Sequence, residues 1–599
     1  MSTPPLRVWA PNADQVEVQL ATGREPMQRH GQWWRYHRAL AHGEDYAFVL
    51  DGEGPFPDPR SPWQPHGVHS ASRHFETTRF AFTDSGWAGR DARGAIIYEL
   101  HIGTFTAEGT LASAAQQLPE LVELGVQMVQ LMPVAAFEGE RGWGYDGVAW
   151  YAVHRAYGGP EALQAFVDTA HGLGLAVSLD VVYNHLGPSG NYLAAFGPYF
   201  TEAHHTPWGQ AVNLDGPGSA EVRAFIIENA LRWLRDFHLD ALRLDAVHAL
   251  IDDSPTHLLA ELADEVAHLS AQLGRPLSLI AESDLNDAVM VTPTSSGGLG
   301  MTAQWADDVH HAIHAFLTGE RHGYYVDFGS AATLTKAMTD VFVHDGSYST
   351  FRGRHWGAPV PATIDGHRFV VSTSTHDQVG NRGLGDRPAV ALSDAQLAVS
   401  AALLLCGPYT PMLFMGQEWA ASTPWQYFTD HADPELAAAV RAGREREFAE
   451  HGWQQVYGRE DIQVPDPQDP ATMADSTLRW EETDTGRHAL VRDFYRRLIA
   501  LRAQEPALHT GDRRTTQVAA SPEGTWLVLT RGSVHVAISH DPGGPPVEIP
   551  LAGAAAMTLL LSWEPAHTVT RAGLTLPPVG VAILRQDRSA STRARVAEA

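Results

Sequence analysis

Cysteine is almost absent from this sequence of 599 residues, and Cys406 is the only one. An intramolecular disulfide is therefore impossible, which fits a reducing compartment, and we expect the protein to be cytoplasmic. The segment Met1–Ala10 lacks a basic stretch followed by an apolar core, so no signal peptide is predicted. No apolar run approaches about 18 residues, so no membrane-spanning segment is expected.

Basic residues are also scarce, with 42 Lys and Arg against 70 Asp and Glu, and the formal net charge is −28. Binding to phosphate groups needs a basic face, so nucleic acid and anionic membranes are excluded as the main partners. A neutral substrate is compatible with this charge. Hydrophobic content of 44% and charged content of 19% are typical of a folded globular protein, which we expect to be a monomer.

The length suggests two to four domains. Alternation of apolar and polar residues in Leu6–Leu20 and Trp33–Leu50 predicts an N-terminal immunoglobulin-like β-sandwich domain over residues 1–90. Strand-like runs return near the other end and predict a small C-terminal β-sandwich domain over residues 511–587. A polar tail, residues 588–599, follows.

Between these regions, strand-like segments alternate with segments of helical periodicity. This order predicts an α/β fold, a (β/α)8 TIM barrel with excursions over residues 91–510. A doubly wound open sheet is the alternative, but no glycine-rich fingerprint follows a first strand. One excursion, Ala420–Glu482, is polar and is expected to be irregular. The eight expected strands are Ala95–Phe105, Val126–Pro133, Leu175–Tyr183, Leu239–Asp245, Leu277–Glu282, Met301–Trp305, His367–Thr373 and Pro411–Met415.

Four of these strands end in a carboxylate, namely Asp180, Asp245, Glu282 and Asp377. In a barrel of this type the carboxyl ends of the strands converge on one mouth, where the chemistry takes place. A single acidic residue could belong to an ordinary ion pair, and for Asp245 with Arg243 alone the two interpretations are about even. Four acidic residues at four strand ends favour an active site.

Such carboxylates, with no metal cluster and no nucleophilic serine motif, suit cleavage of a glycosidic bond. One carboxyl group must be protonated and another ionised, so their pKa values must differ. Arg243 precedes Asp245 by two residues and lies on the same side of the strand, so Asp245 is predicted to be the ionised nucleophile. Glu282 follows the apolar Ile280 and is predicted to be the acid. Asp377 is the third carboxylate, placed to hold sugar hydroxyls.

The stretches Asp180–His185 and Arg243–His248, with Glu282 and His376-Asp377, resemble the four successive motifs of the α-amylase superfamily of retaining glycosidases. The resemblance implies that Asp245 is the nucleophile, Glu282 the general acid/base and Asp377 the stabiliser of the transition state. It further implies substrate-binding roles for Tyr145, His185, Arg243, His248 and His376. His248-Ala249 stands where many amylases have a Lys-His pair, which leaves the role of His248 open.

Other stretches resemble two branches of the superfamily, the glycogen branching enzymes and the maltooligosyltrehalose trehalohydrolases. The stretches around Asp307–His311 and His376–Asn381 are more similar to the trehalohydrolases. The resemblance implies hydrolysis of the α-1,4 bond next to the terminal trehalose unit of a maltooligosyl trehalose. An α-1,4-glucan branching or debranching enzyme is the alternative, and a barrel without catalysis is disfavoured because all three carboxylates are present. Further substrate-binding residues implied here are Asp307, Asp308, His310, His311, Gln378 and Asn381.

No cofactor and no metal ion are predicted. Asn184 stands where many amylases bind calcium, but the following loop, Leu186–Pro217, is short and carries few acidic residues. His310 and His314 have a spacing that can hold zinc, yet no third ligand is evident, so they are interpreted as substrate contacts or helix surface. Among the aromatic residues, Trp33 and Trp34 are expected to pack in the first domain, and Trp419 and Trp425 to stack on sugar at the mouth.

Overall fold

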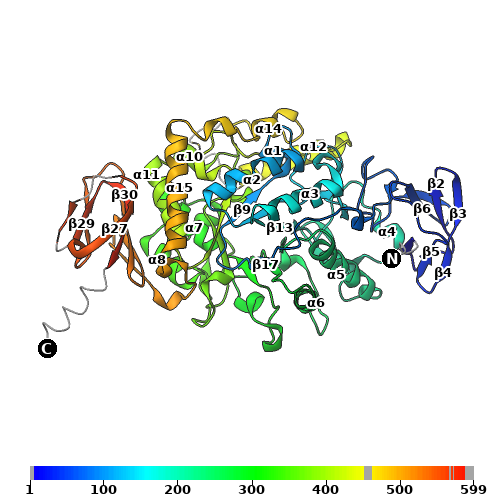
Figure 1. The fold of residues 1–599 in the computed structure, drawn as a ribbon, viewed down its shortest axis with the longest axis horizontal. Helices are drawn as coiled ribbons and strands as arrows, with labels where there is room; N and C mark the ends of the chain where they lie inside the picture. Colours follow the sequence, from blue (N-terminus) through cyan, green and yellow to red (C-terminus); the bar gives the residue numbers. More distant parts are fainter. Residues whose placement is uncertain (1–5, 451–456, 458–461, 565–567, 571–572, 587–599) are drawn as a thin grey trace.

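The computed structural model describes residues 6–450, 457, 462–564, 568–570 and 573–586. A helix-wrapped barrel lies in the middle of the molecule, with the N-terminal strands at one end and the C-terminal strands at the other (Figure 1). No helix within the described ranges is long and apolar enough to cross a membrane.

The barrel is a closed sheet of eight parallel strands. It closes where β9 pairs with both β10 and β22, with Ile97 opposite Met128 on one side and Met412 on the other. The predicted fold class is confirmed, and each strand lies within its expected range except that β22 begins one residue early. The strands are β9 (Ile97–Leu100), β10 (Met128–Leu131), β13 (Ala176–Val181), β16 (Ala241–Leu244), β17 (Ser278–Ala281), β18 (Ala303–Trp305), β21 (Phe369–Ser372) and β22 (Thr410–Phe414).

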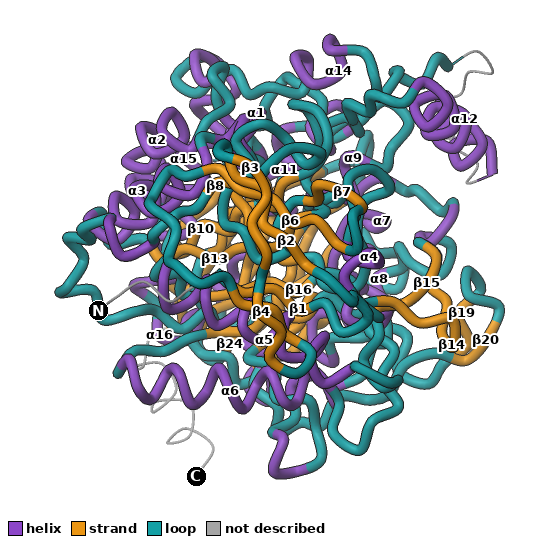
Figure 2. Tube along the Cα trace, turned by 90° about the vertical axis from the view of Figure 1, so that its right-hand side faces the viewer, coloured by secondary structure: helices purple, strands orange, loops and turns teal. Residues whose placement is uncertain are grey.

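Helices follow the strands and cover the outside of the barrel, as α2, α3 and α15 do beside β10 and β13 in Figure 2. The main ones are α2 (Leu111–Leu124), α3 (Gly159–Gly172), α5 (Ser219–Asp236), α6 (Leu258–Leu273), α7 (Asp307–Thr318), α8 (Ala331–Asp340), α11 (Asp394–Cys406) and α15 (Gly486–Gln504). Short helices are α1 (Ile102–Phe105), α4 (Leu193–Phe196), α9 (His376–Gly380), α10 (Pro388–Ala391) and α16 (Pro506–His509). Short hairpins are β11 (Ala135–Ala136) with β12 (Ala149–Val153), β14 (Phe200–Thr206) with β15 (Gly209–Val212), and β19 (Tyr348–Ser349) with β20 (Arg354–His355).

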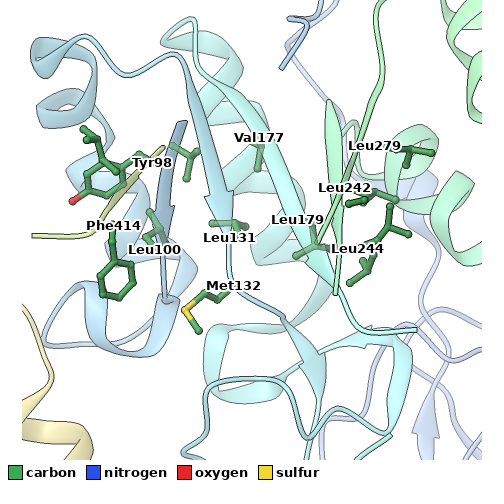
Figure 3. Close-up of a cluster of buried hydrophobic side chains, with 14 of the residues drawn as sticks. Tyr98, Leu100, Leu131, Met132, Val177, Leu179, Leu242, Leu244, Leu279 and Phe414 are labelled. Carbon is green, nitrogen blue, oxygen red and sulfur yellow. The ribbon is translucent and has the colours of Figure 1, made fainter. Parts of the chain in front are cut away.

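Alternation along each strand separates two environments. Leu242 and Leu244 of β16 point to the layer between strands and helices (Figure 3). Ala241 and Arg243 therefore face the barrel axis, where Ala241 packs in a small apolar cluster with Ile97 and other residues of the lower barrel. The axis is apolar at the amino ends of the strands and polar near their carboxyl ends, which places charged side chains at the mouth.

The N-terminal domain consists of two small sheets, β1–β5–β4 and β3–β2–β6–β7 with β8 beside β6. Trp34 is buried, and the Trp33 ring lies under the guanidinium groups of Arg7 and Arg60. Trp33 Nε1 donates to Glu221 of α5 at 3.3 Å. These tryptophans thus pack in the domain and against the barrel, as expected. The strands are β1 (Arg7–Trp9), β2 (Val16–Leu20), β3 (Gly23–Pro26), β4 (Gln28–His30), β5 (Trp33–Arg35), β6 (Asp45–Leu50), β7 (Glu53–Phe56) and β8 (Ser72–Arg73).

The C-terminal domain packs a sheet in the order β23–β24–β25–β30–β27 against another in the order β26–β29–β28. Arg531 connects it to the barrel, since its Nη1 donates to the Cys406 carbonyl at the end of α11 at 3.0 Å. The strands are β23 (Thr516–Ala520), β24 (Trp526–Arg531), β25 (Val534–His540), β26 (Val547–Pro550), β27 (Met557–Ser562), β28 (Thr568–Val569), β29 (Gly573–Leu576) and β30 (Val579–Gln586).

The polar excursion Ala420–Glu482 is more regular than expected, because it contains α12 (Pro434–Glu450) and α14 (Pro470–Asp475). Helix α12 has no apolar stripe, and Phe448 is the buried residue among its described side chains. Hydrophobic periodicity cannot reveal such a helix, whereas its alanine, glutamate and arginine content favours one.

Candidate active site

Arg243 joins three strand ends at the mouth of the barrel. Its guanidinium is completely buried, and Nη1 donates to Asp180 at 2.9 and 2.7 Å and to Asp245 Oδ1 at 2.9 Å. Nη2 forms an ion pair with Glu282 Oε2 at 2.8 Å. The planar group also lies 4.4 Å from the ring centroid of Trp305, a favourable cation–π distance. One cation therefore positions Asp180, Asp245 and Glu282 together.

Burial disfavours the charged form of each of these carboxyl groups, and Arg243 opposes that effect. The balance raises the pKa of Asp180 to about 6 and that of Glu282 to about 7, and it also raises the pKa of Asp245. The expectation that Arg243 singles out Asp245 as the ionised group is wrong, because the guanidinium is shared among three carboxylates. The nearly neutral pKa of Glu282 instead marks Glu282 as the group that can carry a proton.

The backbone turns sharply after β16. Ala246 has φ 38° and ψ 52°, in the left-handed region that residues with a Cβ seldom occupy. In this conformation the Ala246 N–H donates to Glu282 Oε2 at 2.7 Å. The strained residue thus helps to orient the Glu282 carboxyl group beside Asp245, as is common at active sites.

A second cation, His376, lies on the side of Asp180 opposite to Arg243. Tyr145 Oη donates to Asp180 Oδ2 at 2.7 Å and lies 2.8 Å from His376 Nε2. His376 Nδ1 is 2.8 Å from Glu99 Oε1, and Nε2 is 3.3 Å from Asp377 Oδ2. Asn381 Nδ2 donates to Asp377 Oδ1 at 3.3 Å, which places Asn381 beside Asp377.

The charges of Glu99, His376 and Asp377 shift the pKa values of His376 and Asp377. Burial opposes the charged imidazolium, but Asp377 and Glu99 raise the pKa of His376 well above its ordinary value. Burial also disfavours the Asp377 carboxylate, yet the neighbouring His376 lowers the pKa of Asp377 below its usual range. Asp377 is therefore the group that favours its ionised form, whereas the raised pKa of Glu282, about 7, allows Glu282 to carry a proton near neutral pH.

The outer wall of the mouth contains an aromatic residue that the sequence analysis missed. Trp208 lies in the turn between β14 and β15, and 49% of its surface is exposed. Its ring stacks on His185 with centroids 4.6 Å apart and an interplanar angle of 5°. His185 Nε2 in turn donates to the Tyr145 carbonyl at 3.0 Å. A lone tryptophan in a polar hairpin carries no periodic signal, so only this stacking reveals it.

Two predicted residues lie on the exposed rim. His248 is exposed, and its Nδ1 accepts the Asp284 N–H at 3.4 Å. Asp307 is exposed at the first residue of α7 and contacts Gln378, whose Nε2 lies 3.5 Å from its Oδ1. Gln378 itself is buried on α9.

The structure places Asp308 and His310 behind the mouth. Asp308 is buried and accepts the backbone N–H groups of Val343 at 2.7 Å and His344 at 2.9 Å. His310 is 1% exposed and stacks on the buried His314, with ring centroids 5.5 Å apart. Asp308 thus holds the loop at Val343 and His344, and because His310 and His314 are both buried, the expectation of a helix-surface position for these two histidines is wrong.

His311 lies nearer the outside of the same cluster. It is half-buried, and its ring stacks on Tyr324 at 4.7 Å. Its Nδ1 is 3.1 Å from His310 Nδ1. His311 therefore connects the buried histidine stack to Tyr324.

The expected stacking role of Trp419 and Trp425 is wrong, because both side chains are completely buried. Trp425 Nε1 donates to the His376 carbonyl at 3.0 Å, and its ring stacks on Trp143 at 5.3 Å. Trp425 therefore supports the segment that carries His376, and sugar cannot reach it.

Metal-ligating side chains gather at one place among the described residues, where ligand atoms of His204, Asp215 and Asp253 lie within 4.8 Å of one another. His204 Nε2 already contacts Asp215 Oδ2 at 2.8 Å. Asn184 is outside this group, and neither atom of its buried amide has a hydrogen-bond partner.

The site combines carboxyl groups of different pKa with two buried cations, Arg243 and His376, at one barrel mouth. Asp245 and Glu282 are held by the two terminal nitrogens of one guanidinium, and Asp377 is linked to them through His376, Tyr145 and Asp180. Carboxyl groups with separated pKa values can perform acid/base and nucleophilic chemistry on one bond.

Comparison with known proteins gives concordant results. A family model of the α-amylase catalytic domain matches residues 76–200. The chain is 51% identical to a malto-oligosyltrehalose trehalohydrolase of Arthrobacter ramosus over 584 residues, which cover 96% of this chain and 99% of that protein. It is 50% identical to one of Mycobacterium tuberculosis over 572 residues, which cover 94% and 96%.

The crystal structure of a Salmonella typhimurium protein assigned as an α-amylase matches with a TM-score of 0.87 and 35% identity, covering 97% of both chains. A 1,4-α-glucan branching enzyme of Corynebacterium jeikeium is more distant, at 28% identity over 70% of this chain and 61% of that enzyme.

Replacing Arg243 by glutamine is expected to lower the free energy of unfolding by about 3–5 kcal/mol at pH 8, because three buried carboxyl groups lose their cation. The loss should be smaller at pH 5, since Asp180 and Glu282 are protonated below their pKa values of about 6 and 7. Urea unfolding at the two pH values measures both losses.

The double variant Arg243→Gln/Asp180→Asn is the control, because it removes one of the uncompensated charges. It should recover part of the stability at pH 8. An equal loss at both pH values, with no recovery in the double variant, would contradict the electrostatic role of Arg243.

Proposed function

The chain belongs to the malto-oligosyltrehalose trehalohydrolase family of the α-amylase superfamily, and we propose that it hydrolyses the α-1,4-glucosidic bond next to the terminal trehalose unit of a maltooligosyl trehalose, releasing trehalose. The observation that carries this proposal is the shared guanidinium of Arg243, which holds Asp245 and Glu282 side by side at the mouth. A branching or debranching reaction is the second candidate, and the full-length identity to trehalohydrolases disfavours it.

The proposed mechanism is a double displacement with retention of configuration. Asp245 attacks the anomeric carbon, and its carboxylate oxygen forms an ester as the glycosidic C–O bond breaks. Glu282 gives its proton to the leaving oxygen of the trehalose unit. The Glu282 carboxylate then takes a proton from water, whose oxygen displaces Asp245 from the anomeric carbon. Glu282 thereby returns to its protonated state.

The remaining groups contact the sugar or stabilise the positive charge that develops on it in the transition states of these steps. Asp377 is held ionised by His376, so its negative charge faces the oxocarbenium-like sugar in the transition state. Trp208 offers an exposed aromatic face at the rim, and we assign it to stacking on a sugar ring. His248, His311 and Asp307 complete the proposed wall of the substrate site.

Composition supports the remaining proposals. We propose that the enzyme acts as a cytoplasmic monomer on a neutral glucan, without a nucleic-acid or membrane partner. The net charge of −28 and the single, buried cysteine agree with this setting. The proposed domain limits remain 1–90, 91–510 and 511–587, with the tail 588–599 outside the described residues.

Substrate choice is tested by incubating the protein separately with maltooligosyl trehalose, amylose and a branched glucan. Free trehalose from the first substrate is expected, as measured by chromatography of the products. New branch points in amylose or removal of branches would instead favour the second candidate. The Asp245→Asn protein, purified in the same way, controls for contaminating enzymes.

The nucleophile is tested by Asp245→Asn, because an amide cannot form the glycosyl ester. We expect kcat to fall by about 10³-fold or more, with no change in the circular dichroism spectrum. Proton NMR of the first wild-type turnovers should show the new reducing end as the α-anomer. An initial β-anomer would exclude the retaining mechanism, and substantial residual kcat would show that another residue is the nucleophile.

The pH dependence of kcat/KM tests the role of Glu282. Activity requires Glu282 protonated and Asp245 ionised, so kcat/KM should fall above about pH 7, where Glu282 loses its proton. It should also fall in acid as Asp245 becomes protonated. Glu282→Gln should lower kcat/KM and abolish the alkaline limb, while Glu418→Gln, a buried carboxyl outside the site, should leave the limb in place. An alkaline limb that persists in Glu282→Gln would assign it to another group.

A further inference from the structure

We propose that Glu99 is a positioning residue that holds His376 as a doubly protonated imidazolium and thereby keeps Asp377 ionised beside the reacting sugar. The part of this inference that concerns catalysis rests on the proposed function. The protonation of His376 itself does not, because it follows from the hydrogen bonds around the ring.

Glu99 lies on β9 with its side chain toward the barrel axis, and it is completely buried. Both of its carboxyl oxygens contact the same residue. Oε1 is 2.8 Å from His376 Nδ1, and Oε2 accepts the His376 backbone N–H at 3.1 Å. Glu99 thus determines both the position of the His376 backbone and the orientation of its ring, without reaching the mouth itself.

The proton on His376 Nε2 follows from the neighbouring bonds. Both oxygens of Asp180 accept from Arg243 Nη1, so Asp180 is an acceptor on both sides. The hydrogen of Tyr145 Oη is therefore donated to Asp180 Oδ2, 2.7 Å away. Tyr145 Oη has a single hydrogen and can only accept from His376 Nε2 at 2.8 Å. Nε2 must carry a hydrogen.

The proton on His376 Nδ1 follows from Glu99. A carboxylate has no hydrogen to give, so the contact of 2.8 Å requires Nδ1 to donate. With hydrogens on both nitrogens, the ring is a cation. Without the carboxylate of Glu99, Nδ1 could lose its hydrogen and His376 could become neutral while keeping its bond to Tyr145.

Other titratable groups around His376 are few among the described residues. Asp377 and Asp180 are anions that favour the imidazolium, and Tyr145 accepts from it. His101 packs nearby but is neutral, because burial lowers its pKa to about 3. Of the anions, only Glu99 contacts Nδ1, so only Glu99 can hold the second hydrogen.

The imidazolium matters for the reaction because Asp377 lies among like charges. Asp245 disfavours a second anion at the mouth, whereas His376 Nε2, 3.3 Å from Asp377 Oδ2, compensates for it. A neutral His376 would remove the positive charge beside Asp377, so the carboxylate would lose its compensating partner and be held less firmly in place to stabilise positive charge on the sugar. Glu99 therefore affects the transition state indirectly, through His376 and Asp377.

The test compares wild type with Glu99→Gln on α-maltotriosyl fluoride, a glycosyl donor whose fluoride leaves without protonation. The alkaline limb due to Glu282 is then absent, and wild-type kcat/KM should be flat from pH 6.5 to 8.5. In Glu99→Gln, His376 should titrate near the ordinary histidine value of about 6.5. Its kcat/KM should fall about tenfold or more across that range. A profile as flat as that of wild type would overturn the proposal.

Two variants are controls. Glu418→Gln makes the same substitution at another buried carboxyl of the barrel, one that bonds to Tyr98 at 2.9 Å, and should show a flat profile. Glu99→Asp keeps an acceptor for Nδ1 and should restore part of the alkaline activity. A fall of kcat/KM at alkaline pH in Glu418→Gln, or no recovery of alkaline activity in Glu99→Asp, would show that the loss in Glu99→Gln comes from a general loss of packing.

The protonation state is also measured directly, with no substrate present. In full-length enzyme labelled with ¹⁵N-histidine, the His376 signals, identified by their loss in His376→Gln, should show two protonated ring nitrogens at pH 8. In Glu99→Gln one nitrogen should be unprotonated at that pH. A neutral ring in the wild type would refute the inference about Glu99 even if trehalose is released. The converse result, an imidazolium in an enzyme that releases no trehalose, would refute only the proposed function.

Discussion

A guanidinium inside a barrel needs partners that water cannot supply, and Arg243 finds them in three carboxyl groups from three strand ends. This requirement organises the mouth. Because Asp180, Asp245 and Glu282 share one cation, none of them is neutralised alone, and their ionisation states depend on one another. Burial then decides which group keeps a proton, and the pKa of Glu282, at about 7, separates it from the others.

The second cation, His376, is connected to the same carboxyl groups from the other side of the barrel. Asp180 accepts from Arg243 on one side and from Tyr145 on the other, and Tyr145 passes the network on to His376. Asp180 therefore links the two cations, directly to Arg243 and through Tyr145 to His376. The mouth is an alternating arrangement of buried positive and negative groups, fixed before a neutral sugar enters, which is the condition for electrostatic stabilisation of a transition state.

Much of the site could be predicted because strand ends in a barrel converge whatever the loops do. Asp245, Glu282 and Asp377 each follow a buried strand, so their proximity follows from topology. Contacts made across the barrel could not be predicted in this way. The sharing of Arg243, the burial of Trp425 behind His376 and the stacking of Trp208 on His185 depend on side chains that are far apart in the sequence.

The sequence by itself determined the eight alternating strands and helices and the acidic residues that end four of the strands, because periodicity and order along the chain are local properties. Only the tertiary structure decided which residues reach the mouth and which support it. His310 and Trp419 carry the same chemistry whether buried or exposed, and their burial results from packing against distant elements. In the sequence, Glu99 is only an acidic residue within a strand, and its contact with His376 forms only when the barrel closes. The charge of that histidine is therefore a property of the fold.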